Sequence, residues 1–159
     1  MGISINLYRL GKAENILEIK NLETEIEASK SSKVDLYKMT QDLAVIFLNT
    51  VNPFDDMKTI PYKMLFGNAV NQTAGWRTIG GFIPSSEINP IVEWITANKV
   101  NSVEEFTEMY NGLSGEVKNE LYEIGSPDVN ELYNGYIKPL MNFYFAAKEG
   151  DNSVVVIGE

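Results

Sequence analysis

The sequence predicts an α+β fold in which a small mixed or antiparallel sheet, including the N- and C-terminal strands, packs against several helices. Near the start, residues 3–10 alternate apolar and polar side chains, and near the end the stretch SVVVIG at 153–158 contains four consecutive apolar residues. Both patterns favour strands, and helical spacing of apolar residues dominates between them. Because 159 residues fall in the size range of one domain, we expect a single α+β domain over residues 1–159.

The first strand is expected to be buried on one face only. Ile3, Ile5 and Leu7 share that face, and the opposite face carries polar groups and Tyr8. Residues 12–29 are rich in glutamate and in helix-forming residues. We therefore expect one or two short surface helices there, with their glutamates facing water.

A longer helix is predicted over residues 32–50. Ser32 suits the N-cap position, and apolar residues recur from Leu36 to Phe47 at spacings of three and four. Two prolines and several turn-forming residues then predict an ordered loop over residues 49–63. The short apolar runs at 64–66 and 78–83 are candidate strands.

Three helices are expected in the second half before the last one. The first runs from about Pro84 to Asn98, and Pro90 fits only its first turn. Ser102 and Glu105 have the spacing of a capping box for the second. The third is expected over residues 116–124.

The last helix has the clearest pattern. Ser126 suits its N-cap, Pro127 its first position, and Asp128 the positive helix end. Apolar and aromatic residues then hold one face for nearly five turns, so we expect its aromatic side chains to be core. These are Tyr133, Tyr136, Phe143, Tyr144 and Phe145.

A kink is predicted within this helix. Pro139 cannot donate a hydrogen bond to the carbonyl of Gly135, and a glycine there eases the steric clash. Gly150 is expected to end the helix. Because residues 153–158 are apolar at nearly every position, we place that strand centrally in the sheet.

The composition excludes several kinds of site. There is no cysteine and no histidine, so thiol nucleophiles, imidazole bases and the usual transition-metal ligands are absent. Carboxylates are the remaining acid–base groups, and a hard cation is the remaining metal class. We expect no cofactor and favour a protein that is not an enzyme.

The charge of the chain limits the partners that it can bind. There are 22 acidic and 13 basic residues, a net charge of −9, and the basic residues are scattered singly. Nucleic acids and anionic membrane surfaces both require clustered positive charge, so we expect neither as a partner. The longest apolar run is too short for a membrane span, and the N-terminus lacks a signal-peptide pattern, so we expect a cytoplasmic protein.

One glycine-containing stretch, GWRTIGGFI at 75–83, raises the question of a nucleotide site. Gly75 and Gly80 have P-loop spacing, but Gly81 stands where a P-loop requires lysine, and the Rossmann spacing is also missing. We favour a turn in which Gly80 and Gly81 permit positive φ. The alternative is a small anion or ligand pocket lined by Trp76, Arg77 and the amides near Gly80 and Gly81.

Two acidic groups are weaker candidates for function. Asp55 and Asp56 lie in the proline-bounded loop, where functional residues often occur, but neighbours in sequence usually point apart. Glu104, Glu105 and Glu108 share a helix face and are typical of a solvated surface. Neither group defines an acid–base pair.

Four stretches together resemble a bacterial family. They are MGISINLYRL at 1–10, DLYKMTQDLAVIFL at 35–48, MLFGNA with GWRTIGGFIPSSEI at 64–88, and YIKPLMNFYFAAKEGDNSVVVI at 136–157. In this order they resemble the YfbM-like proteins, a domain family of unknown function. Family members often carry Trp and His where this chain has residues 37–40. The resemblance implies an α+β fold and a bacterial cytoplasmic setting, and it implies no reaction.

Two hypotheses of function follow. The first is a non-enzymatic acidic protein-interaction module, for example of the inhibitor or immunity type, that masks a basic protein partner. The second is a small-molecule (anion) binding protein or hydrolase with a pocket near Trp76 and Arg77, joined by Asp55 and Asp56.

Overall fold

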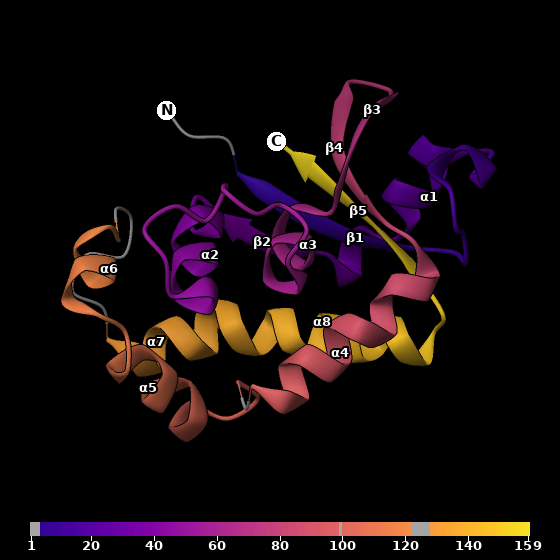
Figure 1. Ribbon diagram of the computed structural model, residues 1–159. Coiled ribbons are helices and arrows are strands. Elements are labelled where there is room, and N and C mark those ends of the chain that lie inside the picture. The colour runs from indigo at the N-terminus through magenta and orange to yellow at the C-terminus, as the bar shows by residue number, and fades with distance from the viewer. Residues whose placement is uncertain (1–3, 99, 122–127) are drawn as a thin grey trace.

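A five-stranded sheet with the order β2-β1-β5-β4-β3 forms the centre of the fold (Figure 1). The computed structural model describes residues 4–98, 100–121 and 128–159. Every neighbouring pair of strands is antiparallel. The strands are β1 (Ile5–Leu10), β2 (Val34–Tyr37), β3 (Asn68–Ala74), β4 (Arg77–Ile83) and β5 (Ser153–Gly158). The predicted α+β class, with the first and last strands in one sheet, is confirmed.

Helices cover both faces of this sheet unequally. Helices α2, α3, α4 and α8 pack on one face and form the larger helical layer, and α1 packs on the other face (Figure 1). The α-helices are α1 (Leu22–Ala28), α2 (Thr40–Leu48), α3 (Ile60–Phe66), α4 (Ile88–Ala97), α5 (Val103–Asn111), α6 (Gly115–Asn119), α7 (Val129–Leu132) and α8 (Lys138–Glu149). Short 3₁₀ turns occupy Ile16–Glu18, Lys30–Ser32 and Ser85–Glu87. The sheet is thus the middle layer of three.

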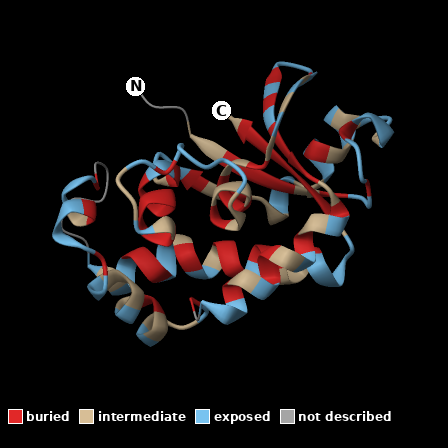
Figure 2. Ribbon diagram, in the orientation of Figure 1, coloured by how far each residue is buried: buried red, intermediate tan, exposed pale blue. Residues whose placement is uncertain are grey.

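The two central strands show the effect of this double cover. In β5 the residues from Ser153 to Ile157 are all buried, which confirms its predicted central position (Figure 2). The prediction that β1 is buried on one face only is wrong. Asn6 and Tyr8 are also buried, because α1 and the turn at Ile16 cover that face.

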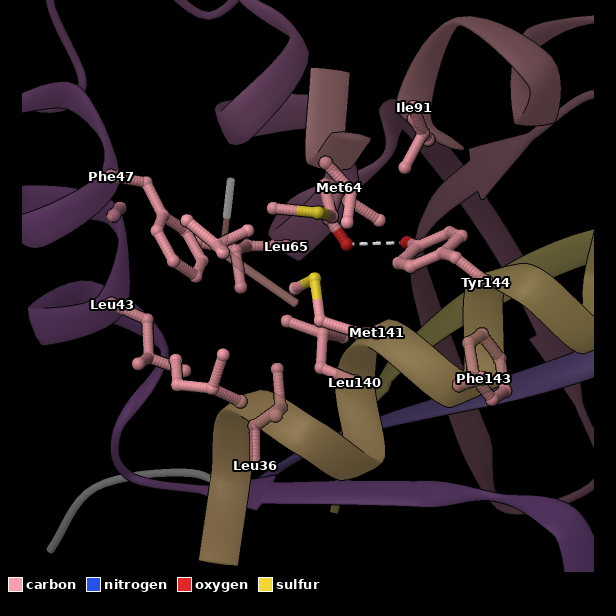
Figure 3. Close-up of a cluster of buried hydrophobic side chains, with 14 of the residues drawn as sticks. Leu36, Leu43, Phe47, Met64, Leu65, Ile91, Leu140, Met141, Phe143 and Tyr144 are labelled. Atoms are coloured by element: carbon pink, nitrogen blue, oxygen red, sulfur yellow. Dashed lines mark hydrogen bonds between the residues drawn. The ribbon is translucent and has the colours of Figure 1, made fainter. Parts of the chain in front are cut away.

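The main core lies between the sheet and the larger helical layer. Leu43 and Phe47 from α2, Leu65 from α3 and Leu140 from α8 meet there (Figure 3). The Tyr144 hydroxyl donates a hydrogen bond to the carbonyl of Met64 and so joins α8 to α3. The expected burial of the α8 aromatics is confirmed: Tyr133, Phe143 and Tyr144 are buried, and Tyr136 and Phe145 pack against the core.

Two predicted elements are wrong in type. Residues 32–50 do not form one helix, because Val34–Tyr37 pairs with β1 and Tyr37 takes a positive φ of 50° before α2 begins. Residues 64–66 belong to α3 and not to a strand. Thr59 caps α3 by accepting a hydrogen bond from the Tyr62 amide at 3.4 Å. Strand β3 was not predicted, since its sequence NAVNQTA is mostly polar.

The later helices follow the sequence more closely. Helix α4 begins at Ile88 with Pro90 in its first turn, and the Ser102 hydroxyl accepts from the Glu105 amide at 3.2 Å, one half of the predicted capping box. The third predicted helix is α6, which ends at Asn119. Ser126 and Pro127 lie outside the described residues, and Asp128 itself is the N-cap of α7.

A π-helical turn lies directly before the helix turn that contains Pro139, where the sequence predicted a kink. It spans Tyr133–Ile137 and joins α7 to α8, whose first turn contains Pro139. A π turn removes the need for the bond that proline cannot donate. Gly150 is the C-cap of α8, as predicted.

Candidate functional site

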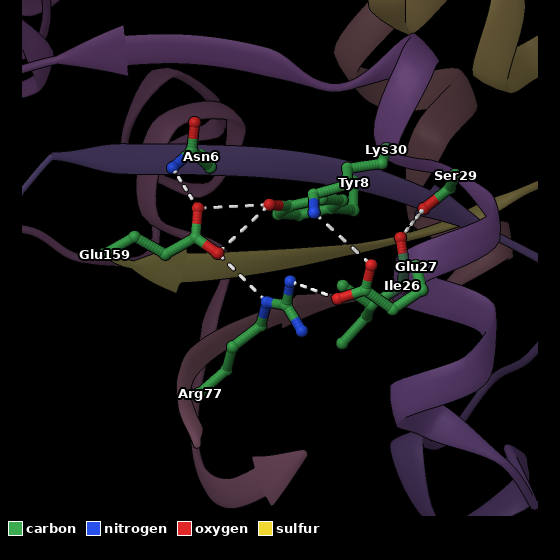
Figure 4. A network of polar contacts seen from close by, with 8 residues as sticks. All are labelled: Asn6, Tyr8, Ile26, Glu27, Ser29, Lys30, Arg77 and Glu159. Carbon is green, nitrogen blue, oxygen red and sulfur yellow. Dashed lines mark hydrogen bonds and ion pairs between the residues drawn. The ribbon is translucent and has the colours of Figure 1, made fainter. Parts of the chain in front are cut away.

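Arg77 lies buried between two carboxylates on the α1 face of the sheet. Its side chain is 2% exposed. Its Nη2 atom lies 2.6 Å from Oε1 of Glu27 on α1, and its Nε atom lies 3.0 Å from Oε1 of Glu159, which directly follows β5 (Figure 4). One guanidinium therefore joins a helix to two strands.

Glu159 also receives hydrogen bonds from β1. The Tyr8 hydroxyl donates to both of its oxygens at 3.0 and 3.1 Å, and Asn6 Nδ2 donates to Oε2 at 2.5 Å. Burial, together with the Glu159 carboxylate, raises the pKa of Tyr8 to about 12. The hydrogen bond from Arg77 lowers the pKa of Glu27. We call Asn6, Tyr8, Glu27, Arg77 and Glu159 the Arg77 cluster.

The charges in this cluster limit what it can bind. The two carboxylates already offset the positive charge of Arg77, and Lys30 lies 3.4 Å from Glu27. Trp76 is 71% exposed, and its ring lies 4.6 Å from the guanidinium carbon. The carboxylates hold Nη2 and Nε, and the third nitrogen, Nη1, is buried and has no hydrogen-bond partner among the described residues. Because the side chain is only 2% exposed and its charge is already offset, the geometry suits a structural link more than an anion site.

The neighbouring glycines lie on a different part of β4. Gly81 pairs with Val156, and the register shifts between Ile79 and Gly81, so Gly80 is the extra residue of a β-bulge. A Cβ on Gly81 would lie 1.9 Å from the Phe66 carbonyl oxygen. The positive φ in this stretch, 63°, belongs to Gly75 in the hairpin turn, so the expectation of positive φ at Gly80 and Gly81 is wrong.

The predicted site residues therefore occupy three separate places. Trp76 and Arg77 lie at the hairpin and on the α1 face, whereas Gly80 borders a hollow on the opposite, α3 face. Asp55 and Asp56 are exposed in the loop before α3, where Asp56 Oδ1 accepts from the Lys58 amide at 3.0 Å. The structure does not bring these aspartates to Arg77.

A separate group of carboxylates lies at one end of the molecule. Residues 101–137 contain eight acidic residues and one lysine, Lys118, whose ammonium lies 5.4 Å from the Tyr110 ring centre. We call the exposed carboxylates of α5, α6 and α7 the acidic surface. They belong to Glu104, Glu108, Glu116, Glu120, Asp128 and Glu131.

A solved structure has the same architecture. The chain aligns with YfbM from Escherichia coli, a protein of unknown function, at a TM-score of 0.51 and 15% sequence identity, over 98% of this chain and 99% of that one. The chain has the YfbM fold. No protein-family model and no curated protein matches the sequence. The YfbM-like resemblance predicted from the sequence is confirmed at the level of the fold.

The likeness to YfbM brings no reaction with it, because YfbM itself is of unknown function. Within the described residues, no three carboxylates converge as a metal-binding group. Nor does any described helix have the length and apolar character to cross a membrane.

Sequence reasoning missed most of the Arg77 cluster. Glu27 was one of several glutamates expected to face water, and Glu159 carried no pattern at all. Asn6 and Tyr8 were assigned to a solvated face. The one available signal was Arg77 itself, since a lone arginine in an apolar strand needs a carboxylate partner when buried.

Proposed function

We propose that this chain is a non-enzymatic, acidic protein-interaction module of the bacterial cytoplasm, and that it binds a basic protein through the acidic surface. The observation that carries this proposal is where the charge lies. Residues 101–137 have a formal charge of −7, and all other residues together sum to −2. An inhibitor or immunity-type protein that masks a basic surface is one form of this function.

The geometry of the acidic surface supports this proposal. Helices α5, α6 and α7 lie together at one end of the molecule, away from the β3–β4 hairpin (Figure 1). Among the described residues, no lysine or arginine forms an ion pair with these carboxylates. Unpaired charges of one sign create a local potential that attracts a partner of opposite sign and speeds its association.

The second hypothesis, anion binding or hydrolysis near Trp76 and Arg77, has less support. Arg77 already faces Glu27 and Glu159, and Asp55 and Asp56 lie elsewhere. The acidic surface is therefore the better candidate.

The proposal is tested by capture from a lysate of the natural host. The wild-type chain is compared with a variant that carries Glu104→Gln, Glu108→Gln, Glu116→Gln and Glu120→Gln. We expect the wild type to retain a basic protein in about 0.1 M salt and release it in about 1 M, where the Debye length falls to about 3 Å. The variant is expected to lose most of this capture. Equal capture by both proteins, or capture that salt leaves unchanged, would refute the proposal.

A further inference from the structure

A hollow of about 570 Å³ lies between α3 and the sheet, on the face opposite the Arg77 cluster. Its walls are mainly apolar, with Ile5 from β1, Phe66 from α3 and Val156 from β5. Met57 borders it and is 60% exposed. A volume of about 300–1,000 Å³ with apolar walls is typical of small-molecule sites.

Aromatic rings form one side of this hollow. Tyr62 and Phe66 both line it, with ring centres 4.7 Å apart, and Phe54 packs on both from outside at 6.0 and 5.6 Å. Phe54 is itself 47% exposed. Such rings offer a large apolar surface to a ligand.

The charge of the lining is opposite to that of the whole protein. Its residues include Lys58 and Lys63 and no carboxylate, although the chain has 22 acidic and 13 basic residues. Lys63 is paired with Glu87 at 2.9 Å, and Asn68 donates to the same carboxylate. Lys58 forms no ion pair within the described residues, so its ammonium is available to a ligand.

We propose that this hollow binds a small amphipathic monoanion, a carboxylate on a hydrocarbon or aromatic body. The body packs against Ile5, Phe66 and Val156, and the carboxylate pairs with Lys58. Because none of these residues belongs to the acidic surface, this site is independent of the proposed function.

Gly80 provides the sharpest way to close the site. It lines the hollow at the bulge of β4, and a Cβ built on it meets no atom within 4 Å. Leucine at this position would therefore occupy the hollow without striking the surrounding walls at its Cβ. Gly115 is a matched control, because its Cβ would also meet nothing within 4 Å and it lies on α6.

The test uses two fluorescent probes with the same ring system. One is the anion 1-anilinonaphthalene-8-sulfonate, and the other is uncharged N-phenyl-1-naphthylamine. We expect saturable binding of one sulfonate probe per chain, displaced by decanoate more strongly than by decanol. Gly80→Leu is expected to weaken binding of both probes about tenfold or more, with Gly115→Leu unchanged.

Lys58→Gln separates charge from packing and lies on the surface, where it leaves the fold intact. It is expected to weaken binding of the sulfonate probe about two- to fivefold and to leave the affinity for the uncharged probe unchanged. Circular dichroism and urea midpoints establish that each variant is folded. The proposal is overturned if no saturable binding is found, or if Gly80→Leu binds the probes as tightly as the wild type. It is also overturned if Lys58→Gln loses as much affinity for the uncharged probe as for the sulfonate probe.

Discussion

Replacing Arg77 with alanine is expected to destabilise the fold strongly. The substitution leaves the Glu159 carboxylate, whose side chain is 15% exposed, without a positive partner. Breaking a buried ion pair by removing one side costs about 3–5 kcal/mol, because the remaining charge stays desolvated. Since Glu27 is 46% exposed and can return to water, most of this loss comes from Glu159.

The expected loss can be measured by thermal and urea unfolding. For a chain of this size, each 1 kcal/mol lowers the melting temperature by about 2–4 °C, so we expect a drop near 10 °C. Glu27→Gln is the comparison and should cost much less than Arg77→Ala. Adding Glu159→Gln to Arg77→Ala should restore part of the loss, because the buried charge is then removed.

Two results would contradict this reasoning. One is an Arg77→Ala variant that unfolds at the wild-type midpoint. The other is that Glu159→Gln lowers the free energy of unfolding by the same amount in Arg77→Ala as in the wild type. Arg77 and Glu159 would then be energetically independent. Either result would assign Arg77 a role other than the link between α1, β4 and the residue after β5.

Further predictions concern the bulge of β4 and the pH dependence of stability. Gly81→Ala should cost about 3 kcal/mol or more, because its Cβ would lie 1.9 Å from the Phe66 carbonyl oxygen. Gly80→Ala, one residue away, should change stability by less than about 1 kcal/mol, and equal urea midpoints for the two variants would refute the bulge assignment. The pKa of Tyr8 is raised from 10.0 to about 12 in the folded chain, so between these pH values only the unfolded chain releases the phenol proton. Stability should therefore fall as pH rises through this window, by at most about 1.4 kcal/mol per pH unit from this group. Tyr8→Phe lacks this contribution. The difference in free energy of unfolding between wild type and Tyr8→Phe should therefore shrink from pH 10 to pH 12. A difference that stays constant over this range would show that Tyr8 does not titrate in this way.

Local sequence rules predicted the elements that depend on local physics. The strand at 153–158 is apolar at nearly every position, and the C-cap glycine at 150 and the capping serine at 102 act on their own neighbours. These features need no knowledge of distant contacts.

The errors came from tertiary contacts that no local pattern encodes. The helical spacing of Leu36 and Met39 did not indicate a helix, since Leu36 lies in β2 and Tyr37 after it takes a positive φ. Polar β3 is a strand because β4 lies beside it. The partners of Arg77 are 50 and 82 residues away in the chain, so residue types alone could not join them.

The most direct test of the proposed function separates the position of the charge from its amount. One variant removes four carboxylates from the acidic surface, by Glu104→Gln, Glu108→Gln, Glu116→Gln and Glu120→Gln. The other removes four exposed carboxylates elsewhere, by Glu23→Gln, Asp55→Asn, Glu93→Gln and Glu149→Gln. Both variants have the same net charge, so long-range attraction from total charge is equal in the two.

The measurement is capture of a basic protein from the host lysate at about 0.1 M salt, followed by native mass spectrometry of what is retained. We predict that the second variant retains the partner as the wild type does and that the first loses it. Equal retention by both variants would contradict the claim that the acidic surface is where the partner binds.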